Sequence, residues 1–144
     1  SAASAPPEEF QETDPSYFDV VSCAGGYRIK KYNGPRKGIV VIPSRIDGKE
    51  VVEIGEEAFS FCSGLTWVIF PPSVAKIGRF AFEFCESLIG AFFPDGAVEL
   101  WADSFGGCSK LTVYAPAGSL IEQVADKFDL PFVPLEAFLE APGM

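Results

Sequence analysis

The apolar positions of this chain recur with a period of 23 residues between Ile54 and Glu122. Three successive segments of this length place an aliphatic residue, a phenylalanine, a cysteine and a leucine in the same four columns. A fixed period in the twenties is typical of a stacked solenoid, in which each unit buries its apolar residues against its neighbours. The pattern predicts a short right-handed α/β solenoid of about three such repeats plus a variant first unit. The columns are Ile54, Ile77, Leu100; Phe59, Phe82, Phe105; Cys62, Cys85, Cys108; and Leu65, Leu88, Leu111.

Each regular unit is predicted to hold a short helical turn followed by a strand. Ile54, Ala58 and Phe59 fall at i, i+4 and i+5, which suits one buried face of a helix of about two turns. The strand follows the cysteine and ends at a proline, because proline has no N–H to donate to a ladder. The expected strands cover residues 65–70, 88–93 and 111–115.

The segments before residue 38 predict a tether and a cap. Residues 1–15 are small, acidic and proline-containing, which favours a flexible tether with Phe10 as its only large apolar anchor. Residues 16–37 contain two predicted strands, 17–21 and 27–32, around a glycine-containing turn. We expect this hairpin to cap the open end of the first unit, because a terminal unit would otherwise expose its apolar face.

The solenoid is expected over residues 38–118, followed by a C-terminal cap and tail over 119–144. Its variant first unit contains Asp47-Gly48, a hairpin turn signal. Ser119 and Glu122 have the spacing of a capping box, which predicts a helix that runs to about residue 128. The proline-containing segment after this helix favours an extended edge strand.

The repeat motif resembles that of the BspA-like (Treponema-type) leucine-rich repeat proteins. The matching stretches are IPSxIDGKxVxxIGxxAFxxC, from Ile42, and LxxVxFPxSVxxIGxxAFxxC, from Leu65. The third unit departs from the motif, with Trp101 in place of glycine and Ser104 in place of alanine. The resemblance implies a leucine-rich repeat solenoid in a secreted or cell-surface bacterial protein. It further implies adhesion or binding to host proteins as the role.

The strands of such repeats alternate between core-facing and outward side chains, and here the outward positions are apolar. They could have been polar without cost to the core, so we interpret them as an exposed strip that binds a protein partner. The predicted partner-binding residues are Ile39, Val41, Trp67, Ile69, Phe92 and Tyr114. Three other occupants remain open: the N-terminal tether, an adjacent domain, or a second copy of the chain. The last two would make the chain a structural spacer or a self-associating module.

Charge and composition narrow the function further. The net charge is −9 and the chain has no histidine, which argues against nucleic acid and anionic lipid as partners. No serine has a base partner, no motif cradles a nucleotide and no calcium-loop pattern is present, so we expect no catalytic activity, no cofactor and no metal. No apolar run approaches the ~20 residues of a membrane span, so membrane insertion is not expected. The chain starts without methionine, which is consistent with a processed secretory form.

The four cysteines form no metal-binding cluster. Three of them share the repeat period, so we expect them to stack as small buried residues. Stacked strands lie about 4.8 Å apart, within reach of a disulfide, so a bridge between neighbouring units stays open. Cys23 lies outside this column and is assigned to the cap.

Overall fold

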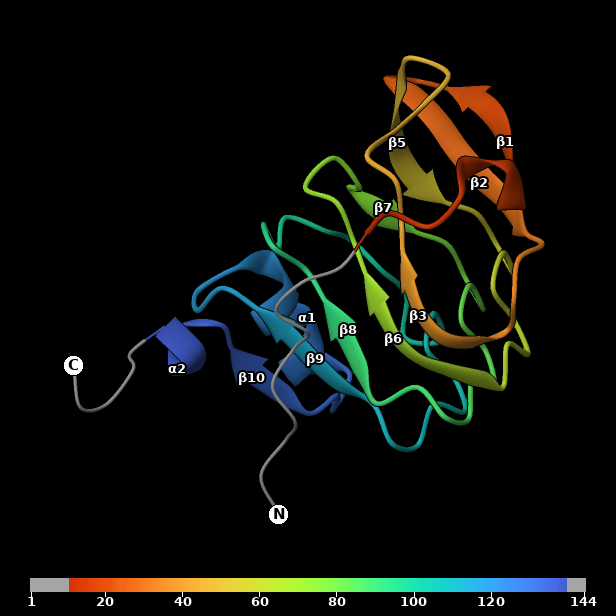
Figure 1. Cartoon of the computed structure of the whole chain (residues 1–144). Helices are drawn as coiled ribbons and strands as arrows, with labels where there is room; N and C mark the ends of the chain where they lie inside the picture. The colour runs from red at the N-terminus through yellow and green to blue at the C-terminus, as the bar shows by residue number, and fades with distance from the viewer. Residues whose placement is uncertain (1–10, 140–144) are drawn as a thin grey trace.

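Five strands stack side by side along the molecule and form the parallel sheet, one of its two five-stranded sheets (Figure 1). The computed structural model describes residues 11–139. Every pair of neighbours in this sheet is parallel, and each step leads from one coil of the solenoid to the next. In spatial order the strands are β10 (Phe132–Pro134), β9 (Thr112–Ala115), β8 (Gly90–Phe92), β6 (Gly64–Ile69) and β3 (Lys37–Val41).

The strand register confirms the alignment of the outward positions. Val41 pairs with Ile69, Ile69 with Phe92, and Phe92 with Tyr114. The third unit reaches Pro116 one residue earlier than the first two units reach their prolines, so Tyr114, rather than Ala115, pairs with Phe92. The pairing continues from Tyr114 to Val133 on β10, so the C-terminal segment adds a further strand to the sheet.

A second sheet starts at the N-terminal hairpin. Its strands β1 (Phe18–Cys23) and β2 (Gly26–Tyr32) are antiparallel, and β2 pairs in parallel with β5 (Lys49–Ile54). The ladder continues through β7 (Lys76–Ile77) to a single bridge between Lys76 and Glu99. Strand β4 (Arg45–Ile46) joins β5 through the predicted Asp47-Gly48 turn, in which both residues have positive φ. The hairpin thus extends the solenoid by pairing with its first coil.

The helical turns expected in the regular units are absent between residues 54 and 63 and between 77 and 86, where the chain forms successive tight turns. Glu57, Phe61, Phe80 and Phe84 adopt left-handed backbone angles, which interrupt a helix after each turn. The N–H groups that a helix would use internally bond to the next coil instead. For example, Phe59 N–H donates to the Ala81 carbonyl at 2.7 Å. The helical prediction was therefore wrong, because hydrogen bonds between coils replace those within a helix.

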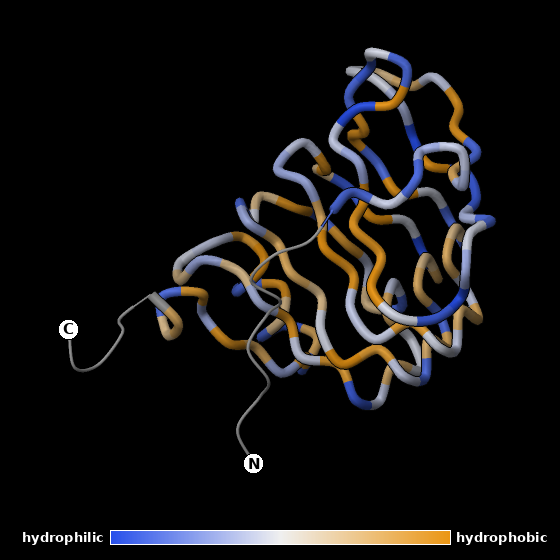
Figure 2. The backbone as a smooth tube through the Cα atoms, in the orientation of Figure 1, coloured by the Kyte–Doolittle hydropathy of each residue, from blue (hydrophilic) through white to orange (hydrophobic). Residues whose placement is uncertain are grey.

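The repeat columns form the core, as predicted. The Phe59 and Phe82 rings stack with centroids 4.7 Å apart, and Phe82 and Phe105 with centroids 5.1 Å apart. Tyr32 of the hairpin extends this stack, since its ring lies 5.0 Å from that of Phe59. The hydropathy colouring of Figure 2 places apolar residues along the strands of each coil. Each coil covers the apolar face of the previous one, which is how a repeat array stabilises units that would not fold alone.

The cysteine column is buried and its thiols are free. The thiols of Cys85 and Cys108 donate to the carbonyls of Phe59 and Phe82, at 3.2 and 3.0 Å. The structure therefore shows no disulfide between neighbouring units in this column. The thiols instead satisfy backbone carbonyls of the preceding coil.

Helices lie only at the ends of the described chain. A single 3-10 turn, η1 (Pro15–Tyr17), precedes the hairpin, and α1 (Leu120–Lys127) follows the last regular unit. Ser119 caps α1, and Glu122 accepts a hydrogen bond from Gly118 N–H at 2.7 Å, so the predicted cap is confirmed. A short helix, α2 (Glu136–Leu139), ends the described chain. Phe10, the predicted tether anchor, lies outside the described residues.

Candidate functional site

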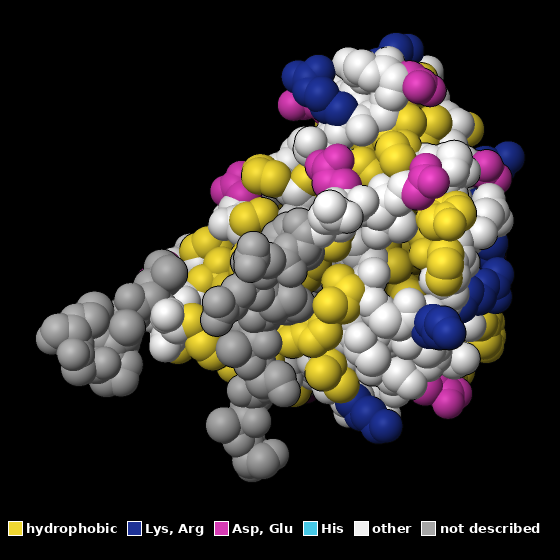
Figure 3. All heavy atoms as spheres, viewed as in Figure 1, with side chains coloured by type: hydrophobic (Ala, Val, Ile, Leu, Met, Phe, Trp, Pro, Cys, Tyr) yellow, Lys and Arg dark blue, Asp and Glu magenta, His cyan; other side chains and the backbone are white. Residues whose placement is uncertain are grey.

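The outer face of the parallel sheet carries its own apolar cluster, separate from the main core. Its buried members are Val41, Trp67, Ile69 and Tyr114. Ile89, Phe92, Val133 and Leu135 pack against these at intermediate exposure. We call these eight residues the strand face. Figure 3 shows hydrophobic side chains, in yellow, gathered over the strands of this sheet.

The six predicted partner-binding residues lie on one side of the sheet but differ in exposure. Ile39 is 46% exposed, and Phe92 is of intermediate exposure. Val41, Trp67, Ile69 and Tyr114 are each at most 7% exposed, so the expectation that all six would be solvent-exposed was wrong. Burial of Tyr114 raises the pKa of its hydroxyl above the ordinary value. Partner binding by these residues stays a prediction.

The C-terminal segment covers one end of the strand face. The Phe138 ring lies 6.0 Å from the Tyr114 ring, which in turn lies 5.1 Å from the Trp67 ring. Leu135 N–H donates to the Ala115 carbonyl at 2.9 Å and fixes the start of α2 against β9. Sequence reasoning missed this contribution because it assigned these residues to a tail. The apolar residues at 133, 135 and 138 were the available signal.

Residues 12 and 13 cover the opposite end. Thr13 N–H donates to the Val41 carbonyl and Thr13 Oγ1 accepts from Val41 N–H, both at 2.9 Å. Glu12 Oε2 accepts from Ser44 N–H at 3.2 Å. This part of the expected tether is therefore hydrogen-bonded to the edge strand β3. Such bonds satisfy polar groups that an edge strand would otherwise expose for pairing.

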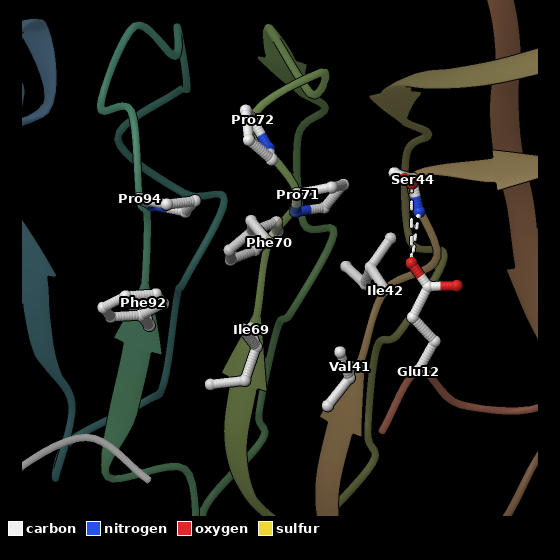
Figure 4. A pocket seen from close by; sticks show the side chains of 10 residues that line it. All are labelled: Glu12, Val41, Ile42, Ser44, Ile69, Phe70, Pro71, Pro72, Phe92 and Pro94. Atoms are coloured by element: carbon white, nitrogen blue, oxygen red, sulfur yellow. Dashed lines mark hydrogen bonds between the residues drawn. The ribbon is translucent and has the colours of Figure 1, made fainter. Parts of the chain in front are cut away.

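An apolar hollow of about 280 Å³ opens between these two ends. Figure 4 shows the side chains of neighbouring strands converging on it, with the Glu12 carboxylate at its margin beside Ser44. Strand-face side chains and the prolines that follow the strands form most of the walls, and the core residues Ile42 and Phe70 complete them. The main wall residues are Val41, Ile69, Phe92, Pro71, Pro72 and Pro94. The hollow can accept an apolar side chain, with a hydrogen-bond acceptor close by.

The hollow offers little for catalysis. Among the residues that line the hollow, Glu12 is the only one with a titratable side chain. Within residues 11–139, no group of three or more His, Cys, Asp or Glu side chains is placed to hold a metal ion. In the same part of the chain no helix is long and apolar enough to cross a membrane.

The stacked coils, parallel strands and shared columns define a solenoid of the leucine-rich repeat class. The family description "BspA type leucine rich repeat region (6 copies)" matches residues 41–127, which is more than half of the chain. The chain belongs to this family. Comparison with curated protein sequences gives no match.

Two solved structures are similar to this chain. A leucine-rich cell surface protein of Faecalibacterium prausnitzii A2-165 is 28% identical with a TM-score of 0.61. The match covers 76% of this chain but 31% of that protein, so the chain corresponds to less than a third of its relative. A leucine-rich repeat protein of T. pallidum is 24% identical over 72% of this chain and 71% of that one, with a TM-score of 0.49.

Proposed function

We propose that this chain is a non-catalytic protein-binding module of a secreted or cell-surface bacterial protein, and that it contacts its partner through the strand face. The observation that carries this proposal is the apolar hollow beside Phe92, on the side of the sheet that does not face the core. Leucine-rich repeat arrays generally present their strands as a binding surface. The proposed role is adhesion to host proteins.

The chemistry of the face indicates the kind of group that it would hold. Six of the ten lining residues are valine, isoleucine or proline, which have little rotamer freedom, and two are the aromatic residues Phe70 and Phe92. A rigid apolar hollow favours insertion of an aliphatic or aromatic side chain, since few side chains lose freedom on binding. Glu12 at the margin can accept a hydrogen bond from a backbone or side-chain donor of the partner.

The test measures binding to purified extracellular-matrix proteins by biolayer interferometry. The variants are Phe92→Asp, on the strand face, and Ile39→Asp, which places charge on the edge strand beside it, at the partner of Trp67 in the register. The control is Phe61→Asp, because Phe61 is an exposed aromatic residue that lies outside the strand face. We expect at least one matrix protein to bind, and Phe92→Asp to weaken that binding by about tenfold or more.

Two results would contradict the proposal. One is that no matrix protein binds, which removes the adhesion role. The other is that Phe61→Asp weakens binding as much as Phe92→Asp, which removes the strand face as the contact. Thermal unfolding of each variant shows whether a loss of binding reflects a loss of folding.

A second candidate function is that of a self-associating spacer. The observation that favours it is the exposure of Ile39 on β3, which is an edge strand of the parallel sheet. Light scattering at rising concentration separates the two candidates. A wild-type dimer that Ile39→Asp converts to a monomer supports the spacer, and a monomer at every concentration supports binding to a different protein.

A further inference from the structure

A second surface feature lies around Trp101, away from the strand face. Trp101 occupies the column that holds Gly55 and Gly78 in the two preceding units. Trp101 is 56% exposed, although tryptophan is the side chain with the most apolar surface to bury. The repeat pattern does not require an aromatic ring at this position, because glycine serves in the other two units.

The second departure of the third unit holds Trp101 in place. Ser104 is fully buried where the earlier units have Ala58 and Ala81. Its hydroxyl accepts a hydrogen bond from Trp101 N–H at 2.9 Å and donates to the Gly78 carbonyl at 2.9 Å. Trp101 and Ser104 are therefore one structural unit, in which the buried serine ties the backbone of the exposed tryptophan to the preceding coil.

An ion pair supports the indole from one side. The Arg79 guanidinium carbon lies 5.4 Å from the centre of the Trp101 ring. Asp103 in turn holds Arg79, with 2.7 Å between Nη2 and Oδ2 and 3.2 Å between Nε and Oδ2. A cation at this distance from an aromatic face is attracted by the ring, so the indole is oriented as well as exposed.

Two hollows meet at this tryptophan. One measures about 430 Å³ and the other about 300 Å³, and both are lined by Lys76, Ile77 and Trp101. Gly55 and Gly78 also line the larger hollow, and because they have no side chains they leave this hollow open. Neither shares a lining residue with the hollow on the strand face. Trp101 thus stands at the junction of two adjoining depressions.

The polar walls carry both signs of charge. Arg28 and Lys76 supply donors. Glu53, Glu56 and Glu99 supply acceptors. Two cations against three carboxylates leave the walls close to neutral, and Arg79 already occupies the vicinity of the ring. A strongly charged ligand would meet like charge on one wall or the other. A neutral molecule that both donates and accepts hydrogen bonds fits this mixture better.

We propose that the two hollows around Trp101 bind a neutral oligosaccharide, with one sugar ring packed against the indole. A sugar ring has apolar C–H groups on its faces and hydroxyls around its edge. The exposed indole matches the faces, and the carboxylates and ammonium of the walls match the hydroxyls. The two adjoining hollows give room for neighbouring sugar units on either side of the ring. This site is independent of the proposed protein-binding function of the strand face.

Nuclear magnetic resonance tests this site, because the two tryptophans of the chain give two indole N–H signals. The Trp101→Ala variant removes one signal and so assigns both. The ¹⁵N-labelled protein is titrated with maltohexaose, cellohexaose, mannohexaose and chitohexaose, each to on the order of 10 mM, which detects millimolar affinity. Hexalysine and hexaglutamate serve as charged probes. Trp67, buried on the strand face, provides the internal reference signal.

We expect at least one hexasaccharide to shift the Trp101 signal saturably and to leave the Trp67 signal in place. The signals of Lys76 and Glu99 should shift with it, and Trp101→Ala should abolish those shifts. Phe61→Ala, which removes another exposed aromatic residue, should bind like the wild type. The proposal is overturned if none of the four hexasaccharides shifts the Trp101 signal, if only a charged peptide does so, or if Trp101→Ala binds as the wild type does. A shift of Trp67 instead would place the sugar on the strand face.

Discussion

The indole of Trp67 on β6 lies directly over Gly90, its partner in the register with β8. A Cβ atom at Gly90 would overlap three atoms of the Trp67 six-membered ring. Glycine within a strand often marks such a close approach. The flat packing of Trp67 across the neighbouring strand, and its contact with Tyr114, therefore depend on the missing side chain at position 90.

Gly90→Ala should destabilise the protein by about 1–3 kcal/mol, because the added methyl group forces a rigid ring to move. Gly106→Ala is the matched control, since a Cβ there would meet its nearest neighbour, the Asp103 carbonyl oxygen, at 3.4 Å. The control should change stability by less than about 0.5 kcal/mol. Urea unfolding measures both. Equal effects of the two substitutions would contradict the close approach.

The column positions of the core could be predicted from the sequence, because a solenoid repeats its packing with its period. Phe59, Phe82 and Phe105 had to stack if the units stacked. The local backbone could not be predicted in the same way. Left-handed angles at Phe61 and Phe84 run against the usual preference of a bulky residue, and hydrogen bonds to the next coil stabilise them. Local spacing alone favoured a helix there.

The strand register of the candidate site was predicted correctly, but the solvent exposure of its side chains was not. Alternation along each strand was sufficient to align Val41, Ile69, Phe92 and Tyr114 on one side. Their exposure depends on what else packs on that side, and residues 12–13 and 133–138 are remote from them in sequence. The coupling of Ser104 to Trp101 was likewise invisible beforehand, although both departures from the motif could be seen. The exposure was decided by segments remote in sequence, and the Ser104 hydroxyl bonds both within its own unit and to the preceding coil.

Phe82→Ala should cost about 3–5 kcal/mol of stability, which is the usual range for removing a buried phenylalanine. Phe82 lies in the middle of the aromatic stack, with rings on both sides at 4.7 and 5.1 Å. Phe84→Ala is the control two residues away, because Phe84 is 42% exposed and stacks on the exposed Phe61 at 5.3 Å. It should cost less than about 1.5 kcal/mol. Similar urea midpoints for the two variants would show that the stack does not hold the coils together.

One thiol per chain should react with Ellman's reagent in the native protein at pH 8 well ahead of the other three. Cys23 is half-buried in the hairpin, whereas the other three cysteines are buried in the core column. Reactivity requires an accessible thiolate, so the column should react only after unfolding in urea. Cys23→Ser should remove the rapid phase. Rapid reaction of two or more thiols in the folded wild type would show that the column opens readily.

The cysteine column should also make stability fall at alkaline pH. Burial raises the pKa of the Cys62 thiol from its ordinary value of 9.0. The neighbouring Cys108 thiol, together with burial, raises the pKa of the Cys85 thiol, and the same interaction lowers the pKa of Cys108, so the decline comes from Cys62 and Cys85. A raised pKa means that the folded state keeps its thiol protons at a pH where the unfolded state has lost them. The stability associated with these thiols is therefore complete below about pH 9 and declines as the pH rises above it.

Urea midpoints between pH 8 and pH 10 measure this decline, which should reach at most about 1.4 kcal/mol per pH unit for each thiol. The pH range from 8 to 10 excludes the titration of Tyr32. Burial raises the pKa of Tyr32 from 10.0 to about 12, so its contribution to the pH dependence of stability begins only above pH 10. Cys62→Ala should lower the midpoint at every pH but make the decline shallower, since one buried thiol no longer titrates on unfolding. Cys23→Ser should leave most of the decline in place. A midpoint that stays constant from pH 8 to pH 10 would show that the column thiols ionise equally in the folded and unfolded chains.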